Sequence, residues 1–323
     1  MPKVSVIVPV YGVEKYIERC AHSLFEQTLD DIEYIFVDDC TPDNSIDVLK
    51  KVIDRYKERL ELEKKHVIIE RMPQNSGQAA VREHGIKKSS GDYVIHCDSD
   101  DWVDTDMYRA MFERAVLSGA DIVICDYNVA NENGYTTVHG VLRKGRENII
   151  KDTLALKCSW SVWNKLVKRE LYLDNGLIYP EFSMAEDMLL TSQLLVKAQS
   201  VDYIDKGFYF YSYNPNSIVN KKNVQSILRN FEQNVDNLNK LESFLATRTE
   251  DYSEYIDSIK YRVVSLLNPI SQSEEIKRKW LNTFPGLYKK ILFNHQLTFK
   301  QKIGYYYRFF CTYLTKVKDN AYC

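Results

Sequence analysis

The chain opens with a β-branched run, Val4–Val10, and strand and helix patterns then alternate as far as about residue 127. A mostly apolar run of this length is typical of a strand buried on both faces, hence of a central strand in a parallel sheet. Alternating units of this size predict a layered α/β sheet with helices on its faces. The predicted strands are Val4–Val10, Glu33–Val37, His66–Arg71, Tyr93–Cys97 and Asp121–Tyr127. The predicted helices are 14–27, 44–60, 77–88 and 104–118, the first with Ile17, Cys20, Ala21, Leu24 and Phe25 on its apolar face.

The second part of the chain has a different pattern. Residues 128 to about 215 are irregular, with a helix predicted over 185–197, and helical spacing continues beyond 220. We therefore predict an α/β domain over 1–220, with halves at about 1–127 and 128–220. A helical region over 221–323 follows, and it ends in a tail, 286–323.

Charge is unevenly distributed along the chain. The whole sequence has 43 Lys+Arg and 45 Asp+Glu, a net charge of −2, which excludes a uniformly basic nucleic-acid binder. Residues 286–323 carry seven basic residues and one acid, a net of +6. The near-neutral total therefore combines an acidic body with a basic, aromatic tail.

The tail also has an amphipathic pattern. Its apolar positions recur at helical spacing, with lysines and an arginine between them: Phe299, Ile303, Tyr306, Phe310, Tyr313 and Val317. A basic amphipathic helix with aromatic residues is typical of a segment that binds a membrane surface. The alternative is that this stripe packs on the acidic body of its own chain or on a second copy, which leaves a homodimer open.

Cysteine usage and hydropathy bear on the compartment. The seven cysteines contain no C-x-x-C pair, and their odd number favours reduced thiols over a disulfide framework. Residues 1–10 lack the features of a signal peptide, and no stretch approaches the ~18 apolar residues of a membrane span. We therefore expect a cytoplasmic protein, with any membrane contact at the inner surface.

Carboxylates gather where predicted strands end. These residues are Asp38, Asp39, Asp98, Asp100 and Asp101. In parallel sheets, ligands bind at the carboxyl ends of the strands. Five carboxylates at one edge of the sheet would repel one another unless a cation neutralised them. Asp-x-Asp at a strand end suits Mg²⁺ or Mn²⁺, whose other ligands are water and phosphate oxygens. The alternative is that these acids only cap helices and turns. No G-x-G-x-x-G, Walker A or zinc-spaced histidine motif is present, and His96 is expected to be a packed polar residue.

Six segments in order resemble family 2 glycosyltransferases of the GT-A fold, most closely bacterial enzymes that build capsular, exopolysaccharide or lipopolysaccharide chains. They are VSVIVPVYG (4–12), FVDDCTPDNS (36–45), QNSGQAAVREHGI (74–86), GDYVIHCDSDDW (91–102), VWNKLVKREL (162–171) and EFSMAEDMLL (181–190). The resemblance covers roughly residues 3–220. It implies a nucleoside diphosphate-sugar donor, UDP by default, a divalent metal, and a saccharide or lipid-linked acceptor.

The resemblance also implies individual roles on the donor side. Pro9 and Tyr11 would border the base, and Asp39 would recognise the base edge. Asp98 would contact the ribose or the metal, and Asp100 would contact the metal, with Asp101 as a substitute ligand. The alignment of residues 98–101 with the family motif is uncertain by one position. The other donor-side residues implied are Asn75, Gly77, Arg82 and Ser99, with Arg82 facing phosphate.

On the acceptor side the resemblance makes Asp187 the general base, beside Glu186. From the residues alone, these two acids could instead be solvated first-turn acids of a helix. Trp163 and Lys165 match an acceptor-side motif, the alternative being a packed Trp with Lys165 as a solvated end. Two positions depart from the family pattern, Glu83 where Asn is common and Ser212 where Arg is common, so no contact is carried over there.

Together these features predict an inverting glycosyltransferase that works by a single displacement. Asp187 would deprotonate the acceptor hydroxyl, and a cation would stabilise the departing diphosphate. A sugar-nucleotide nucleotidyltransferase is an alternative, although Pro9–Glu14 lacks the Gly-rich basic loop it would need. A nucleotide-sugar-binding domain without catalysis is a second alternative.

Overall fold

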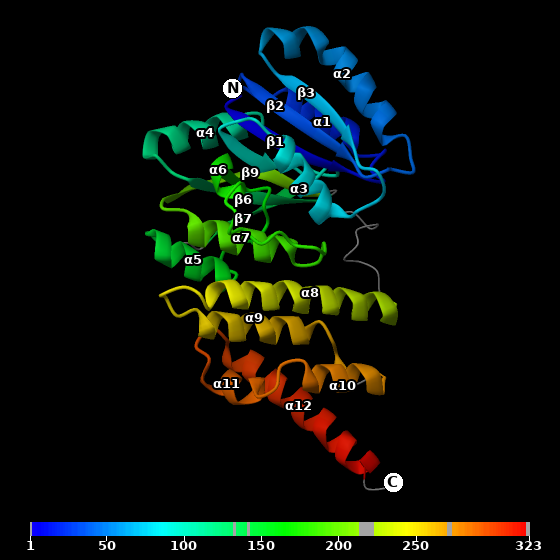
Figure 1. The fold of residues 1–323 in the computed structure, drawn as a ribbon, viewed down its shortest axis with the longest axis vertical. Coiled ribbons are helices and arrows are strands. Elements are labelled where there is room, and N and C mark those ends of the chain that lie inside the picture. Colours follow the sequence, from blue (N-terminus) through cyan, green and yellow to red (C-terminus); the bar gives the residue numbers. More distant parts are fainter. Residues whose placement is uncertain (1, 132–133, 141–142, 213–222, 270–272, 321–323) are drawn as a thin grey trace. The chain divides into compact units, whose positions relative to one another are not determined.

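The structure is a computed structural model that describes the chain except residues 1, 132–133, 141–142, 213–222, 270–272 and 321–323, with side chains in the last helix described up to residue 313. It consists of two compact units (Figure 1). The first contains residues 1–153 and 157–216, and the second 154–156 and 217–323. The boundary predicted near residue 220 falls outside the described residues, and so does the side chain of Val317 in the tail stripe.

The first unit begins with four parallel strands. These are β1 (Val4–Val10), β2 (Ile32–Asp38), β3 (His66–Arg71) and β4 (Tyr93–His96), in the spatial order β3-β2-β1-β4. β1 lies between β2 and β4, with Val10 opposite Asp38 and Ile7 opposite His96. The prediction of a central, doubly buried first strand is confirmed.

Helices connect these strands and cover the sheet (Figure 1). They are α1 (Ile17–Phe25), α2 (Ser45–Leu62), α3 (Gln78–Lys88) and α4 (Met107–Ser118). The five residues predicted for the apolar face of α1 are all buried in the core. Gly85 on α3 packs so closely on Ile7 of β1 that a Cβ there would lie 2.4 Å from a side-chain carbon, so this helix can approach the sheet only with glycine.

The rest of the sheet is mixed. β8 (Lys165–Lys168) pairs antiparallel with β4 and with β6 (Ile122–Asn131), and β9 (Val201–Ser212) pairs parallel with β6. The short strands β5 (Trp102–Val103) and β7 (Gly134–Val138) pair antiparallel with β9 and β6. Sequence patterning did not identify β9, because the register between β6 and β9 shifts twice near Asp126 and breaks the alternation.

Three helices complete the first unit, and α7 (Glu186–Lys197) confirms the helix predicted over 185–197. The others are α5 (Arg146–Leu154) and α6 (Arg169–Tyr172). His96 is fully buried on β4, with its Nε2 3.3 Å from the Tyr172 hydroxyl of α6. It is therefore the packed polar residue that was predicted.

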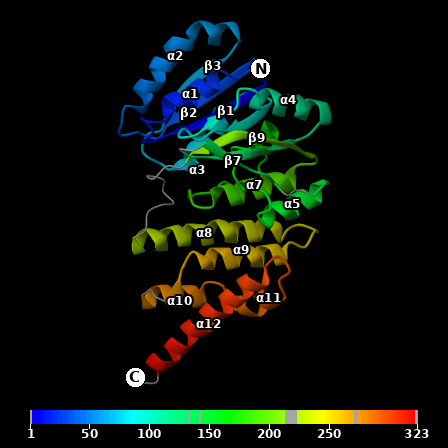
Figure 2. The same cartoon turned by 180° about the vertical axis from the view of Figure 1, so that it is seen from behind.

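The second unit contains α8 (Val224–Leu245), α9 (Ser253–Ser265), α10 (Glu274–Asn282), α11 (Leu287–Phe293) and α12 (Phe299–Asn320). The helical C-terminal extension is thus confirmed. α8 begins after Asn223, whose side chain accepts a hydrogen bond from the Ser226 amide. α8 and α9 lie side by side in both views (Figures 1 and 2). Among the described residues, no helix is long and apolar enough to cross a membrane.

Candidate active site

The end of β2 is tied to the loop that precedes α3. The Asp39 carboxylate accepts hydrogen bonds from the amides of Ser76, at 2.7 Å, and Gly77, at 2.9 Å. Gly77 has a φ of 82° and lies against the Ser183 hydroxyl, so a side chain there would be strained. Burial raises the pKa of Asp39, although these two amides oppose the shift. Asp39 and Gly77, two predicted donor-side residues, are therefore in direct contact.

The other predicted residues of this region lie on neighbouring loops. Tyr11 follows β1 and is half exposed, and Pro9 near the end of that strand is partly buried. Asn75 is exposed on the loop held by Asp39. An exposed aromatic ring beside a carboxylate that is fixed by backbone amides can pack against one face of a planar base.

The acids after β4 point in different directions. Asp98 accepts hydrogen bonds from the side chains of Gln78, at 3.0 Å, and Arg82, at 2.6 Å. Asp101 is buried, and its two oxygens accept from the Tyr209 hydroxyl and the Ser212 amide of β9. Burial, with Asp100 and Asp98 nearby, raises the pKa of Asp101 well above its usual range. Asp100 is partly buried and Ser99 is buried between the acids.

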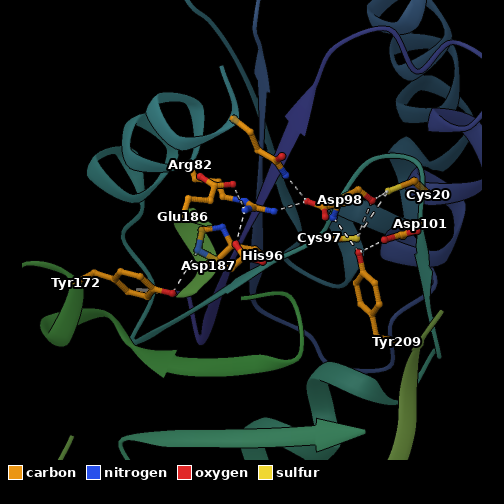
Figure 3. Close-up of polar contacts among 11 residues, drawn as sticks. Cys20, Arg82, His96, Cys97, Asp98, Asp101, Tyr172, Glu186, Asp187 and Tyr209 are labelled. Atoms are coloured by element: carbon orange, nitrogen blue, oxygen red, sulfur yellow. Dashed lines mark hydrogen bonds and ion pairs between the residues drawn. The ribbon is translucent and has the colours of Figure 1, made fainter. Parts of the chain in front are cut away.

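Arg82 on α3 connects this strand end to the start of α7 (Figure 3). Besides Asp98, its guanidinium contacts the carboxylates of Glu186 and of Asp187, the latter at 2.8 Å. Figure 3 shows the arginine between Asp98 on one side and the two α7 acids on the other. We call Arg82, Asp98, Glu186 and Asp187 the Arg82 cluster.

The Arg82 cluster has more negative than positive charge. One buried guanidinium faces three carboxylates, which raise the pKa of Arg82 although its burial opposes them. Burial raises the pKa of Glu186 to about 8, and Arg82 opposes this shift. Burial also raises the pKa of Asp187, whose side chain remains 29% exposed. A carboxylate with a raised pKa and partial access to solvent is suited to accept a proton.

The burial of Glu186 excludes the alternative in which both α7 acids are solvated. Only 5% of Glu186 is exposed, and its carboxylate contacts the Arg82 guanidinium. The predicted contact of Arg82 with phosphate is not tested, since its guanidinium is occupied by the cluster in this structure.

The raised pKa of Glu186 gives a pH-dependent prediction. The folded protein resists ionisation of this group, so its contribution to stability is greatest below the ordinary pKa of 4.5 and is lost as pH rises to about 8. Glu186→Gln lacks this dependence, and its thermal unfolding midpoint is expected to rise relative to the wild type as pH increases across that range. Scanning calorimetry over the range checks it, with the exposed Glu113→Gln as the control. A constant difference between Glu186→Gln and wild type would contradict the prediction.

Comparison with known proteins shows the family of this chain. Residues 5–189 match the family model described as glycosyl transferase family 2, and this segment contains every predicted site residue. The chain belongs to glycosyl transferase family 2. It is therefore a glycosyltransferase, and the nucleotidyltransferase alternative is wrong.

Two relatives of this glycosyltransferase come from Bacillus subtilis strain 168. The chain is 34% identical to the uncharacterized glycosyltransferase EpsJ over 226 residues, which cover 68% of this chain and 63% of EpsJ. It is 32% identical to the putative glycosyltransferase EpsH over 257 residues, which cover 75% of this chain and 72% of EpsH. The chain thus spans somewhat less than two thirds of EpsJ.

The solved structures show the fold. The crystal structure of S. aureus TarS residues 1–349 in complex with UDP has a TM-score of 0.69 to this glycosyltransferase. The sequence identity is 20%, and the match covers 96% of this chain and 88% of TarS 1–349. The predicted GT-A fold is confirmed.

The two residues predicted for the acceptor side of this family 2 enzyme are held by aromatic and polar contacts. Trp163 is buried and stacks on Tyr209, with ring centroids 4.1 Å apart, and on the half-exposed Tyr211. The Lys165 ammonium is also buried, and it donates to the carbonyl oxygens of Ser159 and Ser161 and to the Asn164 side chain. Lys165 is therefore not a solvated end. Whether either residue contacts the acceptor stays a prediction.

Sequence reasoning missed Arg19 on α1. Its guanidinium lies 3.8 Å from the centre of the Trp102 ring and donates to the Asp100 carbonyl and the Ser212 hydroxyl. It thereby connects the loop after β4 with the end of β9. No sequence signal identifies it, because an arginine on an exposed helix turn is an ordinary surface residue.

A second polar cluster of the glycosyltransferase lies on β6, on β9 and directly after β7. The side chains of Asp126, His139 and Asp205 offer ligand atoms within 4.8 Å of one another, the one such group in the described part of the chain. His139 Nδ1 lies 2.7 Å from Asp126 and 3.1 Å from Asp205, and the Asp126 hydrogen bond raises the pKa of His139. Asp98, Asp100 and Asp101 do not converge in this way, because Asp98 turns to Arg82 and Asp101 to β9.

Proposed function

We propose that this glycosyltransferase moves a sugar from a UDP-sugar to a hydroxyl of a saccharide or lipid-linked saccharide during bacterial surface polysaccharide synthesis. The Arg82 cluster is the observation that carries the proposal, because one guanidinium holds a donor-side acid, Asp98, together with the candidate base, Asp187. The UDP bound in the crystal structure of TarS supports uridine as the nucleotide.

The loops at the carboxyl ends of β1, β2 and β4 would hold the donor. In this proposal Tyr11 and Pro9 border the base, and Asp39 recognises its edge while fixed by the Ser76 and Gly77 amides. Asn75, on the same loop as these amides, would contact the sugar nucleotide. These assignments place the donor diphosphate beside residues 98–100.

The donor set fits a divalent cation. Asp98 and Asp100 are partly buried oxygen donors, and the Arg82 cluster to which Asp98 belongs has three carboxylates and one guanidinium. Asp100 with Asp98 would hold Mg²⁺ or Mn²⁺, which supplies charge neutralisation for a departing diphosphate when bound. Asp101 is a less available ligand, because it is buried and each of its oxygens already accepts a hydrogen bond from β9.

Asp187 would act on the acceptor. Its raised pKa and partial exposure allow it to take the proton of an acceptor hydroxyl as that oxygen attacks the anomeric carbon. The bond to the diphosphate breaks as the new glycosidic bond forms, so a single displacement inverts the anomeric centre. Arg82 would keep the Asp187 carboxylate oriented between turnovers. Trp163 and Lys165 would shape the acceptor side.

Asp100→Ala tests the metal and nucleotide assignments. We expect wild type to bind UDP more tightly with Mn²⁺ than without, by roughly ten-fold or more, because the metal links carboxylate and diphosphate. Asp100→Ala should lose this Mn²⁺-dependent gain in calorimetric titrations, together with UDP-sugar hydrolysis in the absence of acceptor. Asp92→Ala, at the other end of β4, is the matched control.

Two results of these titrations would contradict the proposal. Equal UDP binding by wild type with and without Mn²⁺ would remove the metal. Binding of GDP or dTDP in preference to UDP would remove the uridine assignment. Wild-type hydrolysis of a UDP-sugar, in turn, would exclude a domain that binds donors without catalysis.

A further inference from the structure

The last helix, α12, uses one side for packing within the second unit. Tyr305 is only 5% exposed, and its ring lies 5.2 Å from that of Trp280 on α10 and 6.0 Å from that of Tyr261 on α9. Phe309, one turn later, stacks on Tyr288 of α11 at 5.0 Å. These contacts give the helix the single apolar side that packing requires.

A second apolar side of α12 is exposed. We define the exposed aromatic face as Phe293 at the end of α11 with Phe299, Ile303, Tyr307, Phe310 and Tyr313 of α12. Each of these side chains is more than half exposed, from 51% for Tyr313 to 79% for Phe299. A groove lined by Leu292, Phe299, Ile303, Tyr306 and Tyr307, almost entirely apolar, runs along this face. Contiguous exposed apolar side chains of this kind mark a binding surface rather than ordinary surface residues.

The basic residues around the exposed aromatic face favour an anionic partner. Lys289 and Lys300 are exposed beside the face, and the segment 286–323 has seven basic residues and one acid. Lys302 lines the groove and donates to the Leu292 carbonyl at 2.9 Å. Phenylalanine and tyrosine with flanking lysines match the boundary between acyl chains and anionic headgroups.

We propose that the exposed aromatic face docks this glycosyltransferase on an anionic lipid bilayer, with α12 lying in the plane of the interface. The aromatic and aliphatic side chains would enter the acyl boundary, and the lysines would contact the headgroup phosphates. In this proposal the contact is peripheral, at the surface of the bilayer. The proposal does not depend on the donor, the acceptor or the roles of the Arg82 cluster.

A second copy of the chain fits this surface less well. Symmetric pairing through the exposed aromatic face would bring two basic segments of net charge +6 together, and like charges across an interface are costly. A bilayer that contains anionic lipid neutralises the same charges instead.

Vesicle co-sedimentation of the full chain tests the proposal. We expect wild type to sediment with vesicles of phosphatidylcholine and phosphatidylglycerol in equal parts, and much less with pure phosphatidylcholine. The triple variant Phe299→Ser, Ile303→Ser, Phe310→Ser should lose binding by roughly ten-fold or more, since apolar burial drives insertion. Lys289→Glu with Lys300→Glu should weaken binding to the anionic vesicles and reduce its dependence on salt.

The control is matched in chemistry. The variant Leu62→Ser, Val116→Ser, Leu117→Ser also removes three exposed apolar side chains, here from α2 and α4, and should bind like wild type. Thermal unfolding and UDP binding of each variant separate lost docking from lost folding or lost donor binding. A protein that binds vesicles but not UDP would contradict the proposed function alone.

Three outcomes would overturn the docking proposal. The first is wild type that stays in the supernatant with anionic vesicles. The second is a folded triple variant that sediments as well as wild type. The third has two parts: wild type is a dimer and the triple variant a monomer in sedimentation equilibrium without lipid, and neither protein binds vesicles. That result would make the face a contact between copies.

Discussion

Asp187→Asn is expected to slow sugar transfer by a factor of roughly one hundred to ten thousand, because an amide cannot take up the acceptor proton. UDP binding should change little. The Asn carbonyl oxygen can still accept the hydrogen bond that Arg82 donates to Asp187 at 2.8 Å, so the Arg82 cluster keeps its geometry. Steady-state kinetics give the transfer rate, and calorimetry gives the UDP dissociation constant.

Asp202→Asn is the control for this variant, since Asp202 forms a surface ion pair with Arg114 at 3.6 Å. It should transfer sugar at the wild-type rate. An unchanged kcat in Asp187→Asn would remove the base assignment. A normal kcat with a raised KM would instead place Asp187 in substrate binding.

Arg82→Met is expected to lower the free energy of unfolding by about 3–5 kcal/mol, the usual effect of removing one partner from a buried ion pair. The variant leaves the carboxylates of Asp98, Glu186 and Asp187 near one another without their shared cation. Their pKa values should rise, so the loss of stability should shrink as pH falls and the carboxylates become protonated. Urea unfolding at neutral and acidic pH measures both effects.

Two further variants make the Arg82 result specific. Arg82→Lys keeps the charge but loses the planar fork, and should recover part of the stability. Arg109→Met breaks an exposed pair with Asp106 at 2.7 Å and should cost much less stability, because water already screens an exposed ion pair. An Arg82→Met loss as small as that of Arg109→Met would show that the cluster does not stabilise the fold.

Local patterns predicted the first half of the fold well. β1, β3, α1 and α3 lie within a few residues of their predicted bounds, because each is short, strongly patterned and ended by turn residues. The strands β8 and β9 were not predicted. β8 has only four residues, and the pairing of β9 with β6 shifts register twice, so neither strand has a periodicity that a single sequence can reveal.

The candidate site was predictable in its residues but not in its contacts. Acids at the ends of parallel strands follow directly from the order of strands and turns, and the resemblance to family 2 identified the acids at the start of α7. The partners of Arg82 could not be predicted. Glu186 lies 104 positions away in the chain, and nothing local to either residue encodes their contact.

The acids of residues 98–101 show that the sequence predicts which side chains lie at a strand end but not what each of them contacts. Their number at one strand end indicated a cation site, and that inference needs only the sequence and the geometry of parallel sheets. The contacts that each acid makes depend on the elements packed beside it. Arg82 of α3 contacts Asp98, and Tyr209 and Ser212 of β9 contact Asp101. α12 shows the same limit, because its spacing predicts an amphipathic helix but not which side is buried. Periodicity and turn chemistry are short-range properties that the chain expresses locally, whereas ion pairs and packed faces join distant segments and exist only once the chain has folded.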